Sequence, residues 1–155
     1  MENKLLDETG WKILEALQEN ARISYADLGK LVNLTAPAVT ERIRKMEEAG
    51  LITGYHAAVN TELLGAAMRV LIRVQLPAGR DKQFVRAVEE MPEVLACYNV
   101  TGDISFVLQA GVSSTTHLYH LLDRLERFGQ LSTQLILRVY REQRTIKHDF
   151  KEWQT

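Results

Sequence analysis

Hydrophobic positions recur with a helical period in the first third of the chain and with a strand period in much of the remainder. Three amphipathic segments open the chain, and they follow Asp7, Ser24 and Thr35. Each of these residues is a favoured helix N-cap, so the pattern predicts three helices packed as a bundle. The side chains expected in the core of that bundle are Ile13, Leu14, Leu17, Leu28, Leu31, Val32, Val39, Ile43 and Met46.

A short turn joins the second predicted helix to the third. Asn33 tolerates the left-handed geometry that ends a helix, Thr35 caps the next one, and Pro37 lies in its first turn. Two short helices joined in this way predict a helix-turn-helix, whose second helix enters the major groove of DNA. Gly50 ends that helix, and the β-type residues of Leu51–Asn60 predict a wing strand or ribbon.

Corners of this kind also occur in helical domains that never contact DNA, so the surface of the third helix is the deciding feature. The first residues of this surface are small or polar, and the residues that follow them are cations. We predict close approach to bases for Thr35, Ala36, Pro37 and Thr40, and phosphate contacts for Arg42, Arg44 and Lys45. For Arg42 an internal ion pair is an equal alternative.

The charge of this region favours a dimer. Residues 1–60 contain seven Lys and Arg against nine Asp and Glu, a net charge of −2. Because counterion release supplies much of the affinity for duplex DNA, one copy with this balance would bind weakly. A dimer doubles the contacts and presents its recognition helices to successive major grooves, so we expect the operator to be an imperfect palindrome.

Beyond the bundle, four segments alternate as strands do and two have a helical period: strands 68–76, 94–101, 104–112 and 131–140, and helices 80–91 and 113–128. This order predicts a ferredoxin-like βαββαβ fold, and an α+β chain overall. Both helices of such a fold cover one sheet face, which leaves Leu71, Val107 and Ile136 on the other. We therefore expect two sheets to pack against each other in a symmetric homodimer.

The whole chain has 155 residues, of which 46% are hydrophobic, and a formal charge of −1, as expected for one ordinary domain or two small ones. We place a winged helix-turn-helix domain at residues 1–60, a linker at 61–66 and the ferredoxin-like domain with a charged tail at 67–155. The single Cys97 fits a reducing cytosol, and hence a cytoplasmic location. The sequence contains no apolar run long enough for a bilayer and no signal-peptide core, so no membrane association is expected.

Candidates for catalysis are weak. His117 and His120 stand at i and i+3 on a predicted helix, but no third ligand lies at a useful spacing, so we interpret them as a solvated helix face. Cys97 has no local cation or histidine to lower its pKa. Because no glycine-rich phosphate loop is present either, we expect no catalytic residue, no metal and no cofactor.

Two segments resemble the Lrp/AsnC, or feast/famine, family of transcriptional regulators. The first is residues 6–52, in which Leu34-Thr35, Arg42 and Gly50-Leu51-Ile52 stand where the family pattern has them, and the second is VLACYNVTGD at residues 94–103. The resemblance implies a winged helix-turn-helix followed by a ferredoxin-like domain that dimerises and often assembles dimers further. It also implies a small-molecule effector, commonly an amino acid, near the glycine loop.

This resemblance assigns the effector site to Val100, Thr101, Gly102, Asp103, Ser105, Thr133 and Leu135. The chain departs from the family at two places. Gly10 often has an acidic counterpart, and we expect only a small loss of helix stability there. The loop reads Gly102-Asp103-Ile104-Ser105 where the family commonly has Gly-Asp-Tyr-Asp, so the effector differs, binds weakly or is absent.

Two alternatives stay open. Sirohaem decarboxylases resemble this family in fold, and such an enzyme would recruit His56 with Arg69 or Arg73. The chain lacks the Arg-rich stretch of that group around the wing. The second alternative is a free-standing amino-acid sensor that has lost DNA binding, and the small polar start of the third helix argues against it.

Overall fold

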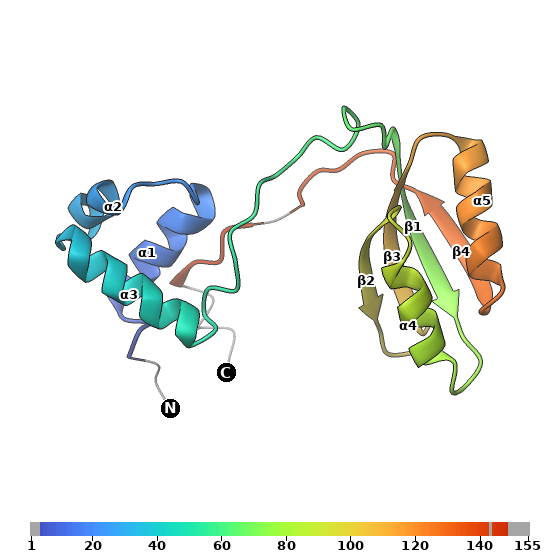
Figure 1. Cartoon of the computed structure of the whole chain (residues 1–155), viewed down its shortest axis with the longest axis horizontal. Coiled ribbons are helices and arrows are strands. Elements are labelled where there is room, and N and C mark those ends of the chain that lie inside the picture. The colour runs from blue at the N-terminus through green and yellow to red at the C-terminus, as the bar shows by residue number, and fades with distance from the viewer. Residues whose placement is uncertain (1–3, 143, 149–155) are drawn as a thin grey trace. The chain divides into compact units, whose positions relative to one another are not determined.

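The computed structural model describes residues 4–142 and 144–148, and the chain divides into two compact units (Figure 1). The first, the helical unit, comprises the residues up to Ala58 together with those from Arg141 onward. The second, the sheet unit, comprises Val59–Tyr140. The chain therefore passes from one unit to the other twice.

The helical unit contains α1 (Glu8–Glu19), α2 (Tyr25–Val32) and α3 (Ala36–Glu48), as the periodicity predicts. Local signals set the boundaries, because the side chains of Asp7, Ser24 and Thr35 accept hydrogen bonds from the first turn of each helix. Asn33 has φ 57° and ends α2 in the left-handed conformation. The core contains Ile13, Leu17, Leu28, Val32, Val39, Ile43 and Met46.

Two expectations for these helices are wrong. Leu31 is 53% exposed, because the buried arc of α2 passes through Leu28, Gly29 and Val32 and leaves position 31 at its edge. Gly10 is a packing requirement rather than a weak point of α1. A Cβ atom at that position would lie 1.8 Å from the carbonyl oxygen of Leu5, so only glycine lets the preceding chain pass this closely.

The segment 51–60, expected to form a wing strand or ribbon, has no strand in the structure. No extended segment of the described chain forms a backbone ladder with it, and a lone extended segment cannot form a sheet. Side chains fix it instead: the Tyr55 hydroxyl donates to Glu47 of α3 at 2.9 Å.

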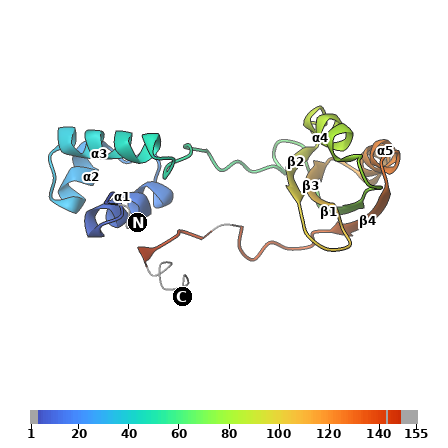
Figure 2. The ribbon, with the colours of Figure 1, turned by 90° about the horizontal axis from the view of Figure 1, so that it is seen from below.

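The sheet unit contains β1 (Met68–Gln75), α4 (Asp81–Glu89), β2 (Val94–Asn99), β3 (Phe106–Val112), α5 (Thr115–Glu126) and β4 (Gln130–Leu135). The strands are antiparallel in the order β2-β3-β1-β4, which confirms the ferredoxin-like prediction. Both helices lie on one face of the sheet (Figure 2). Their side chains bury the alternating stripe of β1 and β3 in one core, with Phe84, Val88, Leu121 and Leu125 as the main helical contributors.

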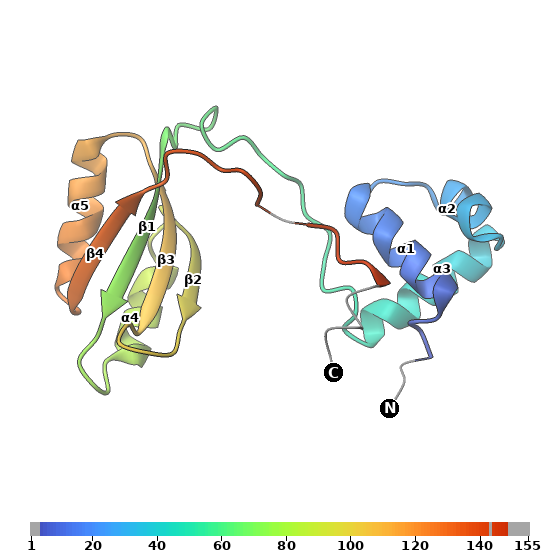
Figure 3. The same cartoon turned by 180° about the vertical axis from the view of Figure 1, so that it is seen from behind.

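The last strand ends earlier than predicted. The final backbone hydrogen bond between β4 and β1 is the one from Ile136 N to Arg69 O at 2.9 Å. The register places Met68, the first residue of β1, opposite Leu137, so residues 138–140 have no residue of β1 opposite them. Leu137 and Val139, expected to continue the strand, are 89% and 44% exposed. The opposite face of the sheet, seen from behind in Figure 3, is not covered by α4 or α5.

The tail after the sheet unit lies against α1. Gln18 donates to the carbonyl of Ile146 at 3.0 Å and accepts from its N–H at 2.9 Å, so one side-chain amide takes the place of a strand partner. The His148 ring meets Trp11 edge-on, with the ring centroids 5.6 Å apart. The described part of the tail therefore packs with the helical unit, whereas our boundaries grouped it with the second domain.

Candidate DNA-binding and effector sites

The exposed surface of α3 contains most of the residues predicted to contact DNA. Thr35 caps the helix, with its Oγ1 accepting from Ala38 N at 3.4 Å, while Pro37 and Thr40 are exposed and Ala36 is half-buried. The hydroxyl of Thr40 donates to the Ala36 carbonyl at 2.9 Å, which leaves its oxygen lone pairs available. The opening turn of α3 is thus small, polar and accessible.

The cations that follow are paired within the helix. Arg44 binds Glu41 with two hydrogen bonds, of 2.7 and 2.9 Å, and also pairs with Glu48. Lys45 lies 3.4 Å from the same Glu41 carboxylate. Hydrogen bonds from Arg44, together with the nearby charges of Arg44 and Lys45, lower the pKa of Glu41 to about 2. We call Glu41, Arg44, Lys45 and Glu48 the α3 cluster; about half of each of their side chains is exposed.

Arg42 is directed away from this cluster. Its guanidinium pairs with the carboxylate of Asp7, the N-cap of α1, and its side chain is 23% exposed. The Gly10 N–H and the Arg42 guanidinium lower the pKa of Asp7. Of the two roles that the sequence leaves open for Arg42, the internal ion pair is the one present in the structure.

The ion pairs of the α3 cluster have a signal in the sequence, because the glutamates and the cations stand three or four residues apart. Glu41 stands three and four residues before the two cations, and Glu48 stands four residues after Arg44. The contact between Tyr55 and Glu47 had no such signal, because Tyr55 follows the helix in an irregular segment.

The glycine loop connects β2 to β3, and only some of its residues are free to meet a ligand. Gly102 has φ 104°, a conformation suited to glycine, and Asp103 is exposed. Ser105 is committed to the fold: its Oγ accepts from Leu76 N at 3.0 Å, and its carbonyl accepts from Val100 N and from the Asn99 side chain.

The other two predicted effector residues are on β4, and β1 lies between this strand and β3, the strand that the loop enters. Thr133 pairs with Ile72 and Leu135 with Val70, whereas the loop enters the sheet beside Val74, at the other end of β1. At about 3.3 Å per residue, the four-residue step from Val74 to Val70 separates Leu135 from the loop by roughly 13 Å along the strand. In one copy of the chain, Leu135 therefore lies apart from the glycine loop.

His117, interpreted from sequence as part of a solvated face, belongs to a half-buried polar cluster. Its Nε2 lies 3.1 Å from Glu93 Oε1, and Arg124 donates to the same oxygen at 2.5 Å. On its other side, His117 Nδ1 accepts from Ser113 N at 3.3 Å. We call Glu93, His117 and Arg124 the Glu93 cluster; the Glu93 side chain is 12% exposed.

Other kinds of site receive no support. Within residues 4–142 and 144–148, no three His, Cys, Asp or Glu side chains are grouped as metal ligands would be. None of the helices described above is both long enough and apolar enough to span a bilayer.

Two family models match the chain in succession. A winged helix-turn-helix DNA-binding model matches residues 6–53, and an Lrp/AsnC ligand-binding domain model matches residues 69–146. The leucine-responsive regulatory protein of Haemophilus influenzae is 36% identical over 123 residues, which cover 77% of this chain and 74% of that protein.

Solved structures have the same fold. Escherichia coli AsnC matches with a TM-score of 0.81 and 30% identity, over 92% of this chain and 98% of AsnC. A transcriptional regulator of Neisseria meningitidis, solved in complex with L-methionine, matches with a TM-score of 0.86 and 27% identity, over 94% of this chain and 99% of that one. With a DNA-binding domain followed by a ligand-binding domain, the chain belongs to the Lrp/AsnC family and is a transcriptional regulator rather than an enzyme.

Proposed function

We propose that this regulator binds duplex DNA through the exposed side of α3, with Thr35, Ala36, Pro37 and Thr40 nearest the bases. The observation that supports this most directly is the accessible, small and polar opening turn of α3, within the segment matched by the DNA-binding model. A helix with such an opening allows its backbone to approach base edges or phosphates closely.

When the protein binds DNA, Arg44 and Lys45 exchange their carboxylate partners for phosphate oxygens. Both cations are paired with carboxylates, but half of each side chain is exposed, and exposed pairs contribute little to stability. A phosphate oxygen therefore replaces Glu41 or Glu48 at small cost. Arg42 acts differently in this proposal: it keeps its contact with Asp7 and fixes the angle of α3 against α1.

The active form is a homodimer, assembled through the sheet face opposite α4 and α5. Arg69, Leu71 and Arg73 of β1 lie on this face beside Val107 of β3, because they alternate with the buried stripe. Tyr98 pairs with Val107 there and is 57% exposed. A mixed apolar and polar face of this kind suits a twofold interface, and two copies present two α3 helices to a palindromic operator.

A small molecule modulates the regulator through the sheet unit. The ligand-binding model that matches residues 69–146 and the methionine-bound neighbour support this step. Asp103, exposed in the glycine loop, is the candidate contact for the ammonium group of an amino acid. Thr133 and Leu135 join it only if another copy of the chain brings its own β4 to the loop.

The test starts from genomic fragments that the wild-type protein retains in a pull-down. Arg44→Ala is expected to weaken binding to all fragments and to flatten the dependence of log K on log salt by about one phosphate contact. Thr40→Ala is expected to lower the preference for selected over random DNA more than it lowers non-specific binding. Lys12→Ala, which removes an exposed cation from α1, is the matched control. If no fragment is retained reproducibly, the regulator does not bind DNA in the way proposed.

Assembly and effector response need two further measurements. Sedimentation at micromolar concentration is expected to give a dimer, and a monomer would contradict the proposed interface. If an amino acid changes DNA affinity or assembly, Asp103→Ala is expected to reduce that response. A normal response in this variant would remove the glycine loop from the effector site.

A further inference from the structure

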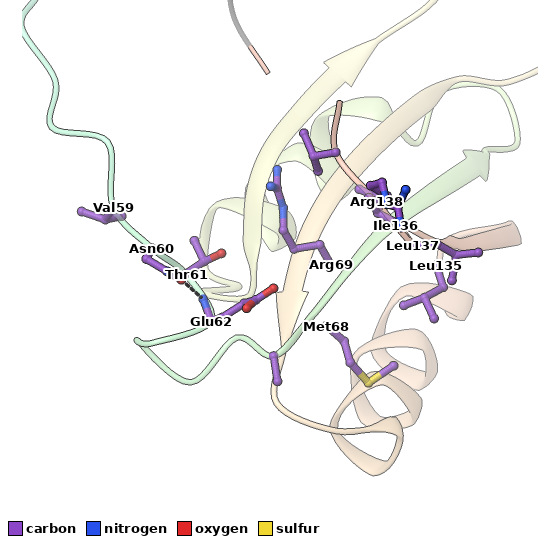
Figure 4. Close-up of a pocket in the computed structure, with 12 residues that line it drawn as sticks. Val59, Asn60, Thr61, Glu62, Met68, Arg69, Leu135, Ile136, Leu137 and Arg138 are labelled. Carbon is purple, nitrogen blue, oxygen red and sulfur yellow. Dashed lines mark hydrogen bonds between the residues drawn. The ribbon is translucent and has the colours of Figure 1, made fainter. Parts of the chain in front are cut away.

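Two segments connect the helical unit to the sheet unit, and both leave the sheet unit at one place. Residues 59–62 and 135–139 line the same hollow, of about 520 Å³, beside the start of β1 (Figure 4). The hydrogen bond from Ile136 N to Arg69 O fixes the second segment there. In the first segment, the Asn60 side chain accepts two backbone hydrogen bonds from the turn that follows it, at 3.0 and 3.2 Å. The starting points of both connections are therefore part of the fold of the sheet unit.

The first connection is anchored in the helical unit by α3, because the Tyr55 hydroxyl donates to Glu47 at 2.9 Å. Residues 56–58 separate Tyr55 from Val59, the first residue of the sheet unit. Each residue of such a link contributes two soft backbone dihedrals, so a single link of this length permits one unit to rotate against the other.

The second connection is anchored by α1, through the side-chain amide of Gln18. Its Nε2 donates to the carbonyls of Leu14 and Ile146 at 3.1 and 3.0 Å, and its Oε1 accepts from Ile146 N at 2.9 Å. The bond to Leu14, one turn earlier in the same helix, orients the amide. The other two bonds then satisfy both backbone groups of Ile146, as a neighbouring strand would.

Two further residues of α1 contact the tail. His148 N donates to Glu15 Oε1 at 3.3 Å, and the His148 ring meets Trp11 edge-on. Trp11, Glu15 and Gln18 are spaced by four and three residues, so they form one stripe along α1. The tail therefore lies along a stripe of the helix, and Gln18 makes the two hydrogen bonds that fix its register.

We propose that Gln18 is a positioning residue for DNA recognition, because by anchoring the tail it turns the tail into a second link between the units. Ile136 and Ile146, the anchored ends of this link, are ten residues apart, so the link spans at most about 36 Å. Two links attached to different helices, α1 and α3, restrict rotations that one link permits. In a dimer, the distance and angle between the two α3 helices then vary little, and the protein selects one spacing between operator half-sites. This inference rests on the proposed function.

The first test uses palindromic duplexes built from a DNA fragment that the protein retains, with the half-sites moved apart by inserted base pairs. An insertion of about five base pairs turns one half-site to the opposite side of the duplex. On this insertion we expect the wild type to lose affinity about tenfold or more, and Gln18→Ala to lose about threefold or less. Affinity for a single half-site should be the same for both proteins. Gln83→Ala, which removes an exposed glutamine from α4, is the matched control and should behave as the wild type does.

The second test needs no DNA. Amide relaxation in the full chain compares the tumbling of α1, α2 and α3 with that of the four strands. We expect one common correlation time in the wild type and a shorter one for the helical unit in Gln18→Ala. The double variant Gln18→Ala/His148→Ala also removes the ring contact with Trp11 and should shorten it further. The thermal midpoint should not fall, because Gln18 is exposed and alanine favours a helix.

Three results would overturn the inference: equal spacing profiles for the wild type and Gln18→Ala, an equal loss of affinity at every spacing and on the half-site, or unchanged tumbling of the helical unit in the double variant. The second of these would mean that Gln18 has a structural role only. If the protein retains DNA and Gln18→Ala keeps the wild-type spacing profile, this inference fails while the proposed function stands. If the protein retains no DNA, the proposed function fails, and faster tumbling in Gln18→Ala still supports the second link.

Discussion

The α3 cluster and the Glu93 cluster are built from the same chemistry, a glutamate shared by two basic side chains, and they differ in burial. Glu41 is half exposed and joins residues of one helix, whereas Glu93 is 12% exposed and joins the start of β2 to α5. Water competes more strongly with the first set of bonds than with the second. The exposure of the α3 cluster fits the exchange with phosphate proposed for it, whereas the Glu93 cluster stabilises the fold.

The largest effect is expected from Glu93→Gln. The change removes the charge that pairs with Arg124 and leaves that guanidinium, 38% exposed, without its carboxylate. Because the Glu93 side chain is largely buried while Arg124 is not, the change is expected to lower the free energy of unfolding by about 1–2 kcal/mol, less than for a fully buried pair. Urea denaturation measures this, with Glu89→Gln on the exposed side of α4 as the control. Equal denaturation midpoints for the two variants would mean that the Glu93 cluster contributes as little to stability as an exposed ion pair does.

Acid should remove the same stabilisation in the wild type. Burial alone raises the pKa of Glu93, but hydrogen bonds from its own backbone N–H, His117 and Arg124 outweigh it and lower the pKa below 4.5. A carboxylate with a lowered pKa stabilises the folded state above the unfolded pKa and loses that contribution as pH falls through the folded pKa. The stability difference between wild type and Glu93→Gln is therefore full at pH 6 and shrinks below about pH 4. A difference that persists at pH 3 would contradict the assignment.

Local signals made most of the helical unit predictable. Asp7, Ser24 and Thr35 each cap the helix that follows them, so three boundaries could be identified from single residues and their neighbours. The strand order followed from alternation, because a βαββαβ pattern has few compact solutions. The α3 cluster was predictable too, since its pairs stand three and four residues apart.

Such local signals do not indicate contacts between residues that are far apart in the sequence. Glu93 meets Arg124 across 31 positions, and nothing near either residue indicates the other. Gly10 looks like a weak helix residue by propensity, and only the passage of Leu5 against it shows why a side chain cannot fit. The alternating pattern includes Leu137 and Val139, although the last backbone hydrogen bond of β4 to β1 is made by Ile136. The sequence of β4 does not indicate where its partner strand begins.

Glu41→Gln changes the exposed α3 cluster instead. The change weakens the hold on Arg44 and Lys45 and removes one negative charge from the DNA-facing surface, so DNA affinity is expected to rise. The slope of log K against log salt should stay near the wild-type value, because Arg44 and Lys45 contact the same phosphates in both proteins. Thermal unfolding is expected to stay at the wild-type midpoint, because the pair is exposed. Titrations between low and moderate salt measure the slope, with Glu19→Gln at the end of α1 as the control. A fall in affinity would mean that Glu41 itself contacts a base.

The smallest effect is expected at the contact between Arg42 and Asp7, which lies between the two clusters in burial. The side chain of Arg42 is 23% exposed and that of Asp7 is 53% exposed, so a double-mutant cycle with Arg42→Gln and Asp7→Asn should give a coupling below about 1 kcal/mol. Asp7→Asn keeps the N-cap oxygen for Gly10 N, so the cycle reports the ion pair rather than the cap. In DNA titrations, Arg42→Gln should leave the salt slope unchanged, because Arg42 does not exchange Asp7 for a phosphate. If the slope falls as much as in Arg44→Ala, Arg42 gives up its ion pair with Asp7 and contacts a phosphate when the protein binds DNA. Even a partly buried ion pair of this protein is then exchangeable.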